Sequence, residues 1–135
     1  IILTSNTNIY RDKLSHSKYY NLSLFDYFLI KNSKNKEFLD KNLTSDEIFK
    51  LNNYFYKNRN EDKINRINKK LIAIAERNNI ILLFKQDFQC EINKEICFGI
   101  TDDGKKIHYD YGHYTLDGAK FFGKKIHQLN WLKID

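Results

Sequence analysis

The fold is decided by residues 61–84, which read EDKINRINKKLIAIAERNNIILLF. Apolar side chains at helical spacing predict an amphipathic helix over about residues 61–77, which Asn78 and Asn79 are expected to end. The apolar face of this helix comprises Ile64, Ile67, Leu71, Ile74 and Ala75. An unbroken apolar run follows at 80–84, as in a strand of a parallel sheet covered on both faces. A helix, a short turn and a buried strand predict half of a parallel βαβ unit, and hence an α/β fold.

A second helix is predicted from its first turn. Thr44 can accept a hydrogen bond from the backbone N–H of Glu47, whose carboxylate can reach back to Thr44. The apolar face of that helix comprises Ile48, Leu51 and Phe55. A polar break at 58–60 is expected to separate it from the helix that follows.

The two ends of the chain complete the expected architecture. Residues 1–4 are an apolar run and predict a buried parallel strand, whereas residues 10–30 predict irregular structure with one helix. The last helix is expected to begin near Thr115. Its buried stripe is expected to comprise Ala119, Phe122, Ile126 and Leu129. The length of 135 residues fits one domain, 1–135.

Composition and charge disfavour several classes of protein. No apolar run approaches the roughly 18 residues that cross a bilayer, and no signal segment opens the chain. The net charge of +6 comes from Lys and Arg interleaved with Asp and Glu, which indicates a solvated surface with a basic bias. Nucleic-acid binding is disfavoured, because no Lys/Arg cluster alternates with aromatic side chains. The chain does not begin with Met, so we expect a fragment of a longer protein.

The two cysteines, Cys90 and Cys97, leave two interpretations open. They form no Cys-x-x-Cys pair and no cluster with histidine that would indicate a zinc site, so no metal is expected. A local disulfide would stabilise the fold by about 2.5 kcal/mol and would imply an oxidising compartment. Two unrelated reduced thiols fit the spacing equally well.

The chemistry is expected in residues 109–119, which read YDYGHYTLDGA and precede the last helix. A loop at the carboxyl edge of a parallel sheet is where α/β proteins place their sites. Gly112 can adopt the backbone angles of a turn that brings Asp110 and His113 together. Asp110 would then accept from one imidazole nitrogen of His113, and the other nitrogen could take a proton from a hydroxyl nucleophile. This spacing alone is a weak signal, because most surface histidines beside an aspartate are inert.

The same region resembles a known family. The run from Asp87 to Gly118 is similar to the C-terminal block of SGNH (GDSL-type) hydrolase domains, closest to those that work with membrane acyltransferases to O-acetylate cell-surface glycans. The matching positions are Ile80 to Phe84, Cys90, Cys97, Asp103-Gly104, Tyr109-Asp110, His113, Thr115 and Gly118-Ala119. The match covers about a third of the chain well. Residues 1–6 are a fainter match to the family's third conserved block.

The resemblance implies a three-layer α/β/α fold with a parallel sheet, incomplete at its N-terminus. It implies that Asp110 and His113 are the aspartate and histidine of a Ser-His-Asp triad, and that Asn6 helps to form the oxyanion hole. It also implies a Cys90–Cys97 disulfide and an extracytoplasmic location, periplasmic or at the cell surface, with a membrane tether outside this chain. Neither a metal nor an organic cofactor is implied.

The nucleophilic serine of that family has no counterpart here. The family places it in a Gly-Asp-Ser element, which this sequence lacks, and the first glycine of the chain is Gly99. The serines are Ser5, Ser15, Ser17, Ser23, Ser33 and Ser45. We therefore expect the nucleophile outside this chain, or else a relative that has lost it.

The function predicted from these residues is a serine O-acyltransferase or esterase that acts on extracytoplasmic carbohydrate. Its partners would be an acyl donor, a glycan acceptor and a membrane acyltransferase, either separate or fused. The alternative is a non-catalytic glycan-binding or structural relative. Under that alternative, the aromatic segment from Tyr19 to Phe28 would stack on sugars.

Overall fold

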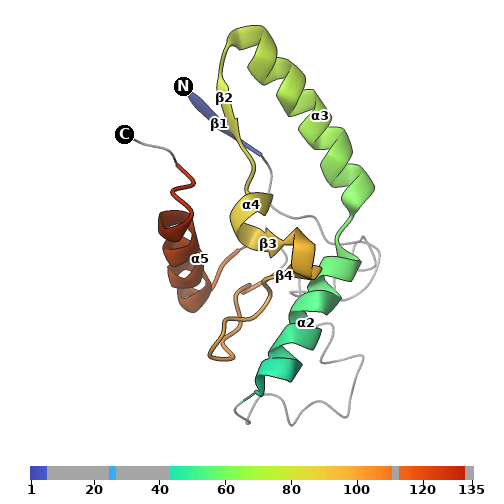
Figure 1. The fold of residues 1–135 in the computed structure, drawn as a ribbon, viewed down its shortest axis with the longest axis vertical. Coiled ribbons are helices and arrows are strands. Elements are labelled where there is room, and N and C mark those ends of the chain that lie inside the picture. Colours follow the sequence, from blue (N-terminus) through green and yellow to red (C-terminus); the bar gives the residue numbers. More distant parts are fainter. Residues whose placement is uncertain (6–24, 27–42, 111–112, 133–135) are drawn as a thin grey trace.

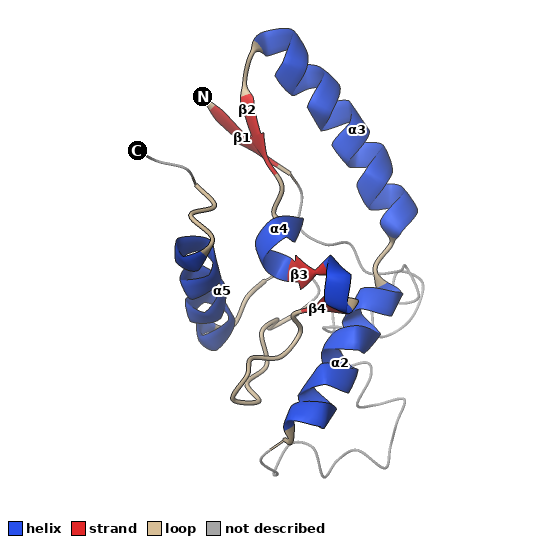
Figure 2. Ribbon diagram, in the orientation of Figure 1, coloured by secondary structure: helices blue, strands red, loops and turns tan. Residues whose placement is uncertain are grey.

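The structure, a computed structural model, describes residues 1–5, 25–26, 43–110 and 113–132, and it shows helices with two small sheets (Figure 1, Figure 2). The elements in chain order are β1 (Ile2–Thr4), α2 (Ser45–Asn58), α3 (Glu61–Asn78), β2 (Ile81–Leu83), α4 (Gln86–Gln89), β3 (Cys90–Glu91), the 3₁₀ turn η3 (Ile92–Lys94), β4 (Ile96–Cys97) and α5 (Leu116–Gln128). This is a mixed α/β arrangement, as the sequence predicts. The three-layer form implied by the family resemblance stays an expectation.

Helix α2 begins with the predicted capping box. The N–H of Glu47 donates to Oγ1 of Thr44 at 3.3 Å, and the N–H of Thr44 donates to the Glu47 carboxylate at 2.8 Å. These two bonds satisfy backbone donors that have no partner within the helix. Leu51 and Phe55 are buried, as predicted, whereas Ile48 is only half-buried.

Helix α3 is also predicted correctly in its bounds, but its buried face is narrower than expected. Asn60 caps its start, and Asn79 ends it in the left-handed conformation at φ 51°. Ile64 and Ala75 are buried. The prediction for Ile74 was wrong, because its side chain lies in solvent. The helix extends past the small sheet (Figure 1). The sheet therefore has too little surface to cover the whole apolar face of the helix.

Strands β1 and β2 pair in parallel, so residues 1–4 and the run after α3 both form strands of a parallel sheet, as predicted, and the structure adds that they are neighbours. Ile2 lies opposite Ile81, and Thr4 lies opposite Leu83. The expected burial of both strands was wrong, because Ile1, Ile2 and Ile81 are exposed and only Leu83 of β2 is buried. In the described part of the chain this sheet has two strands, which is too narrow to enclose the apolar residues at their amino ends.

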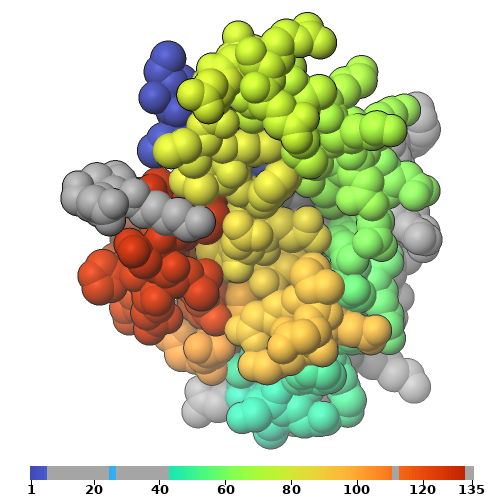
Figure 3. Space-filling view, turned by 45° about the horizontal axis from the view of Figure 1, so that its top comes forward, coloured from blue at the N-terminus to red at the C-terminus, as the bar shows by residue number. Residues whose placement is uncertain are grey.

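The buried core forms two clusters on either side of the segment that follows β2, residues 84–107. The first cluster lies against α2 and comprises Phe25, Leu51, Phe55, Cys90, Cys97 and Ile100. The second lies against α5 and comprises Leu83, Phe88, Ile96, Phe98, Ile107, Phe122 and Trp131. Figure 3 shows this segment, coloured yellow to orange, between α5 and α2. The segment is therefore held from both sides.

Asn52 fixes the segment to α2 from within the core. It is buried, and its Oδ1 accepts from the N–H of Gly99 at 2.9 Å and from the N–H of Ile100 at 3.2 Å. These bonds satisfy two backbone donors that water does not reach. Gly99 is required here because a Cβ would lie 2.3 Å from the ring of Phe55.

Helix α5 begins where predicted, with Thr115 as its N-cap. Its buried stripe differs from the prediction: Phe122 is buried and Ile126 is half-buried, but Ala119 and Leu129 are exposed. Gly118 is buried instead, against Ile107. The face of α5 that packs on the core is therefore centred closer to Gly118 than the sequence predicts. Among the described residues, no helix is long and apolar enough to cross a bilayer.

Candidate functional site

Two successive chain reversals after β4 position the candidate site. The first turns at residues 101–105 and brings the chain back, so that the N–H of Ile107 donates to the carbonyl of Gly99 at 3.1 Å. The second brings His108 and Tyr114 into an antiparallel bridge. We refer to residues 108–110 and 113–115 as the site hairpin.

Backbone hydrogen bonds close the site hairpin at its base. The N–H of Tyr109 donates to the carbonyl of His113 at 2.7 Å, and the N–H of Thr115 donates to the carbonyl of Ile107 at 2.9 Å. The Thr115 hydroxyl donates to the carbonyl of Lys106 at 2.6 Å, and the same oxygen accepts from the N–H of Gly118 at 3.0 Å. Thr115 therefore joins the hairpin to the first turn of α5.

The structure brings Asp110 and His113 into direct contact, as the sequence predicts. Nδ1 of His113 lies 2.8 Å from Oδ2 and 3.0 Å from Oδ1 of Asp110. The backbone N–H of His113 also donates to Oδ1, at 2.8 Å. Because a carboxylate only accepts, these distances favour the tautomer with the proton on Nδ1. The side chain of His113 is 75% exposed and that of Asp110 is 22% exposed, so a reactant can reach the imidazole.

Other predicted participants lie outside the described residues. Asn6 and Gly112 are among them, so the oxyanion-hole and turn assignments stay predictions. Two of the serines are described. Ser45 is exposed at the start of α2, and Ser5 is buried at the end of β1, where its Oγ accepts from the N–H of Lys85 at 2.8 Å. A side chain held in this way has no exposed hydroxyl to present to a substrate.

Cys90 and Cys97 are joined in a disulfide, so the alternative with two reduced thiols was wrong. The two residues are opposite each other in the antiparallel pair of β3 and β4. Both side chains are buried in the cluster against α2. The bridge closes the short turn that precedes the two chain reversals.

His108 is the first residue of the site hairpin, and its side chain is half-buried. Its ring stacks on Phe55 with a centroid distance of 6.1 Å and tilts against Tyr114 at 5.3 Å. Burial lowers the pKa of His108 to about 4; the charge of Asp110 opposes that shift and the charge of Lys106 adds to it. The imidazole is thus neutral at physiological pH.

The burial of His108 predicts an acid-sensitive fold. The unfolded chain protonates this residue near pH 6.5 and the folded protein only near pH 4, so the unfolded state binds more protons in between. The free energy of unfolding should therefore fall by up to about 3 kcal/mol as pH drops through this window. Urea titrations of wild type and of His108→Phe, at about pH 6.5 and about pH 5, measure about half of this loss, because the interval ends above the folded-state pKa.

The substitution keeps an aromatic ring at position 108 and removes its titration. Glu91 and Asp103 have carboxyl pKa values lowered by hydrogen bonds from Lys94 and Thr101, so their contributions are lost only at lower pH. The loss between the two pH values should be smaller in His108→Phe. Equal losses in both proteins would mean that another group is responsible.

Tyr114 and Gln89 are site residues that the sequence did not predict. The amide Nε2 of Gln89 donates to the hydroxyl of Tyr114, and the ring of Tyr114 lies 5.0 Å from that of Phe122. Burial raises the pKa of the Tyr114 hydroxyl, and the hydrogen bond from Gln89 partly offsets this. A signal existed for Tyr114, since it directly follows His113, but nothing in the sequence connects it with a residue so distant in the chain.

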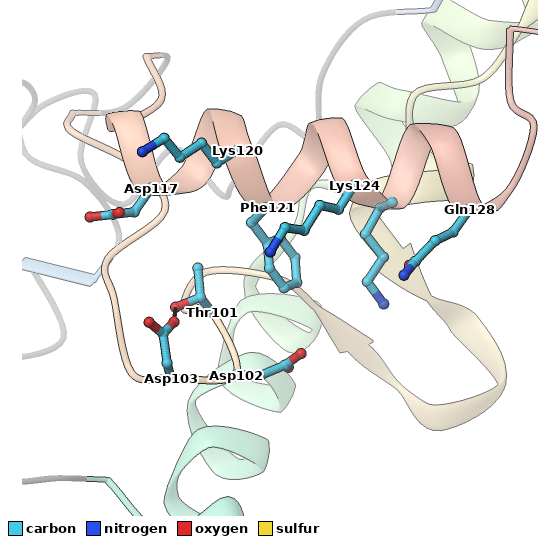
Figure 4. Close-up of a pocket in the computed structure, with 9 residues that line it drawn as sticks. Thr101, Asp102, Asp103, Asp117, Lys120, Phe121, Lys124 and Gln128 are labelled. Atoms are coloured by element: carbon cyan, nitrogen blue, oxygen red, sulfur yellow. Dashed lines mark hydrogen bonds between the residues drawn. The ribbon is translucent and has the colours of Figure 1, made fainter.

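A hollow of about 420 Å³ lies between the turn at 101–105 and one face of α5 (Figure 4). Its lining includes Asp102, Asp103, Asp117, Lys120, Phe121 and Lys124. Neither Asp110 nor His113 lines it, so it is separate from the pair.

No group of three or more His, Cys, Asp or Glu side chains within the described ranges is arranged to hold a metal ion. No protein-family model, curated protein or solved structure matches this chain significantly. The resemblance to SGNH domains therefore stays an expectation from the residues of the site region.

Proposed function

We propose that this chain carries the acid–base half of an SGNH-like serine esterase or O-acyltransferase that acts on extracytoplasmic carbohydrate. The observation that supports it is the contact of the exposed His113 imidazole, through Nδ1, with both carboxylate oxygens of Asp110. A carboxylate that fixes the tautomer of an accessible imidazole is the arrangement by which a histidine activates a hydroxyl.

The proposed mechanism assigns each residue a role. Nε2 of His113 takes the proton of a serine hydroxyl supplied from outside this chain, and the serine oxygen attacks the carbonyl carbon of an acyl donor. Asp110 stabilises the imidazolium that results. His113 then returns the proton to the leaving group, which gives an acyl-enzyme. Backbone N–H groups, and Asn6 in this proposal, stabilise the oxyanion.

The second half of the reaction regenerates the serine. His113 takes a proton from a sugar hydroxyl or from water, and that oxygen attacks the acyl carbonyl. The acyl group leaves the serine as an ester of the sugar or as the free acid, and His113 reprotonates the serine oxygen. No metal or organic cofactor takes part in these steps.

Location and fold are part of the same proposal. The Cys90–Cys97 disulfide supports an oxidising, extracytoplasmic compartment, since such bonds persist there. The parallel pairing of β1 with β2 supports a larger parallel sheet of the three-layer type. A membrane acyltransferase, fused or separate, would supply the acyl donor.

A fluorophosphonate probe tests the proposal in the intact protein, which includes the segment that supplies the serine. The probe forms a covalent bond only with a serine that a base has activated. We expect labelling of one serine in wild type and little in His113→Gln. Absence of labelling in folded wild-type protein would contradict an activated serine and would favour the non-catalytic alternative.

A further inference from the structure

The contact between Asp110 and His113 lies within the site hairpin, where the backbone N–H of His113 also donates to the Asp110 carboxylate. The backbone bonds of the hairpin join Tyr109 to His113 and Thr115 to Ile107, so they shape the hairpin and hold its base. A side-chain contact from the hairpin to the segment that contains β3 and β4 holds it in addition against the rest of the fold.

Tyr114 provides such a contact directly beside the imidazole. Side chains of adjacent residues in an extended strand point in opposite directions, so the exposed His113 and the inward Tyr114 alternate. The Tyr114 ring packs between the ring of His108, at 5.3 Å, and that of Phe122 of α5, at 5.0 Å. Its hydroxyl then reaches the amide of Gln89.

Gln89 is held more firmly than a surface residue would be. It is 4% exposed, and its N–H donates to the carbonyl of Lys85 at 3.1 Å. Its carbonyl accepts from the N–H of Phe98 at 2.9 Å. It also directly precedes Cys90, which the disulfide joins to Cys97. The hydrogen-bond donor to Tyr114 is therefore buried and held by backbone hydrogen bonds on both sides.

We infer that Tyr114 and Gln89 are positioning residues, whose mutual hydrogen bond holds the residue next to His113 in place and so keeps the His113 imidazole on the Asp110 carboxylate. The inference rests on the proposed function for its catalytic consequence. In this proposal neither Tyr114 nor Gln89 contacts the substrate. Their effect reaches the reaction through the tautomer and the direction of the His113 imidazole.

Tyr114→Phe is the central test, because it keeps the packed ring and removes only the hydroxyl. We expect kcat for an activated acetate ester to fall about tenfold in the intact protein, with KM unchanged within about twofold. A change confined to kcat indicates altered positioning of a reacting group rather than weaker substrate binding. Tyr109→Phe is the matched control, since this tyrosine lies on the same hairpin and is 71% exposed.

A double-mutant cycle tests whether the hydrogen bond acts as a unit. Gln89→Leu should lower kcat about as much as Tyr114→Phe, and the double variant should lower it no further. Additive losses would mean that the two residues act independently. Circular dichroism verifies that each variant is folded.

Nitrogen-15 NMR of the His113 ring provides a readout that needs no activity. Wild type should show the tautomer with the proton on Nδ1, Tyr109→Phe should match it, and Tyr114→Phe should show a mixture of both tautomers. An unchanged tautomer and an unchanged kcat in Tyr114→Phe would overturn the inference while leaving the proposed function intact. A shifted tautomer in a protein without esterase activity would overturn the function and leave the positioning role.

Discussion

Replacing His113 with alanine is expected to lower kcat for hydrolysis of an activated acetate ester about 10³-fold in the intact protein. General acid–base catalysis by one side chain contributes about 10²–10⁴-fold, and a serine hydroxyl is a weak nucleophile without its base. The side chain is exposed, so its removal leaves no cavity in the core. Stability should therefore change little, and steady-state kinetics beside a thermal melt would separate the two effects.

His127→Ala is the matched control, because His127 is exposed near the end of α5, away from the pair. It should retain wild-type kcat. Asp110→Asn should lower kcat about 10²–10⁴-fold, since an amide can donate as well as accept and no longer selects the tautomer. Full activity in His113→Ala would remove this residue from the mechanism.

Gly118→Ala is expected to produce the largest loss of stability among single substitutions in the site region. The added Cβ would lie 2.2 Å from the carbonyl oxygen of Ile107 and 2.9 Å from its Cα. Both are backbone atoms and cannot rotate away as a side chain can. We expect a loss of about 3 kcal/mol in the free energy of unfolding, at the upper end for overpacking, measured by urea denaturation.

The same helix provides the control. Gly123 of α5 has nothing within 4 Å of an added Cβ, so Gly123→Ala should stabilise the protein by about 1 kcal/mol through helix propensity. Gly118→Ala should also reduce activity beyond its effect on folding, because the contact joins α5 to the base of the site hairpin. If both variants were equally stable, the packing between Gly118 and Ile107 would be looser than the structure shows.

Local signals predicted most of the elements. The capping box at Thr44, the Asn79 helix end and the Thr115 cap each depend on hydrogen bonds within a few residues, so the sequence predicts them. Burial was less predictable. Ile74 and Ile81 are apolar and exposed, because the surface that would cover a side chain comes from elements that periodicity does not identify.

In the candidate site too, local contacts could be predicted from the sequence and contacts between distant segments could not. The pairing of Asp110 with His113 was predictable, since three residues and a turn suffice to bring a carboxylate to an imidazole. The bond from Gln89 to Tyr114 and the fit of Gly118 against Ile107 were not, because each joins segments that meet only after the chain has folded.

The sequence by itself determined the helix boundaries, the two parallel strands at residues 1–4 and after α3, and the Asp110–His113 contact. Tertiary structure alone decided which apolar side chains are buried, that β1 and β2 are neighbours, and what holds the site hairpin in place. The reason is physical: hydrogen bonds within a turn depend on neighbours in the chain, whereas burial and packing depend on neighbours in space.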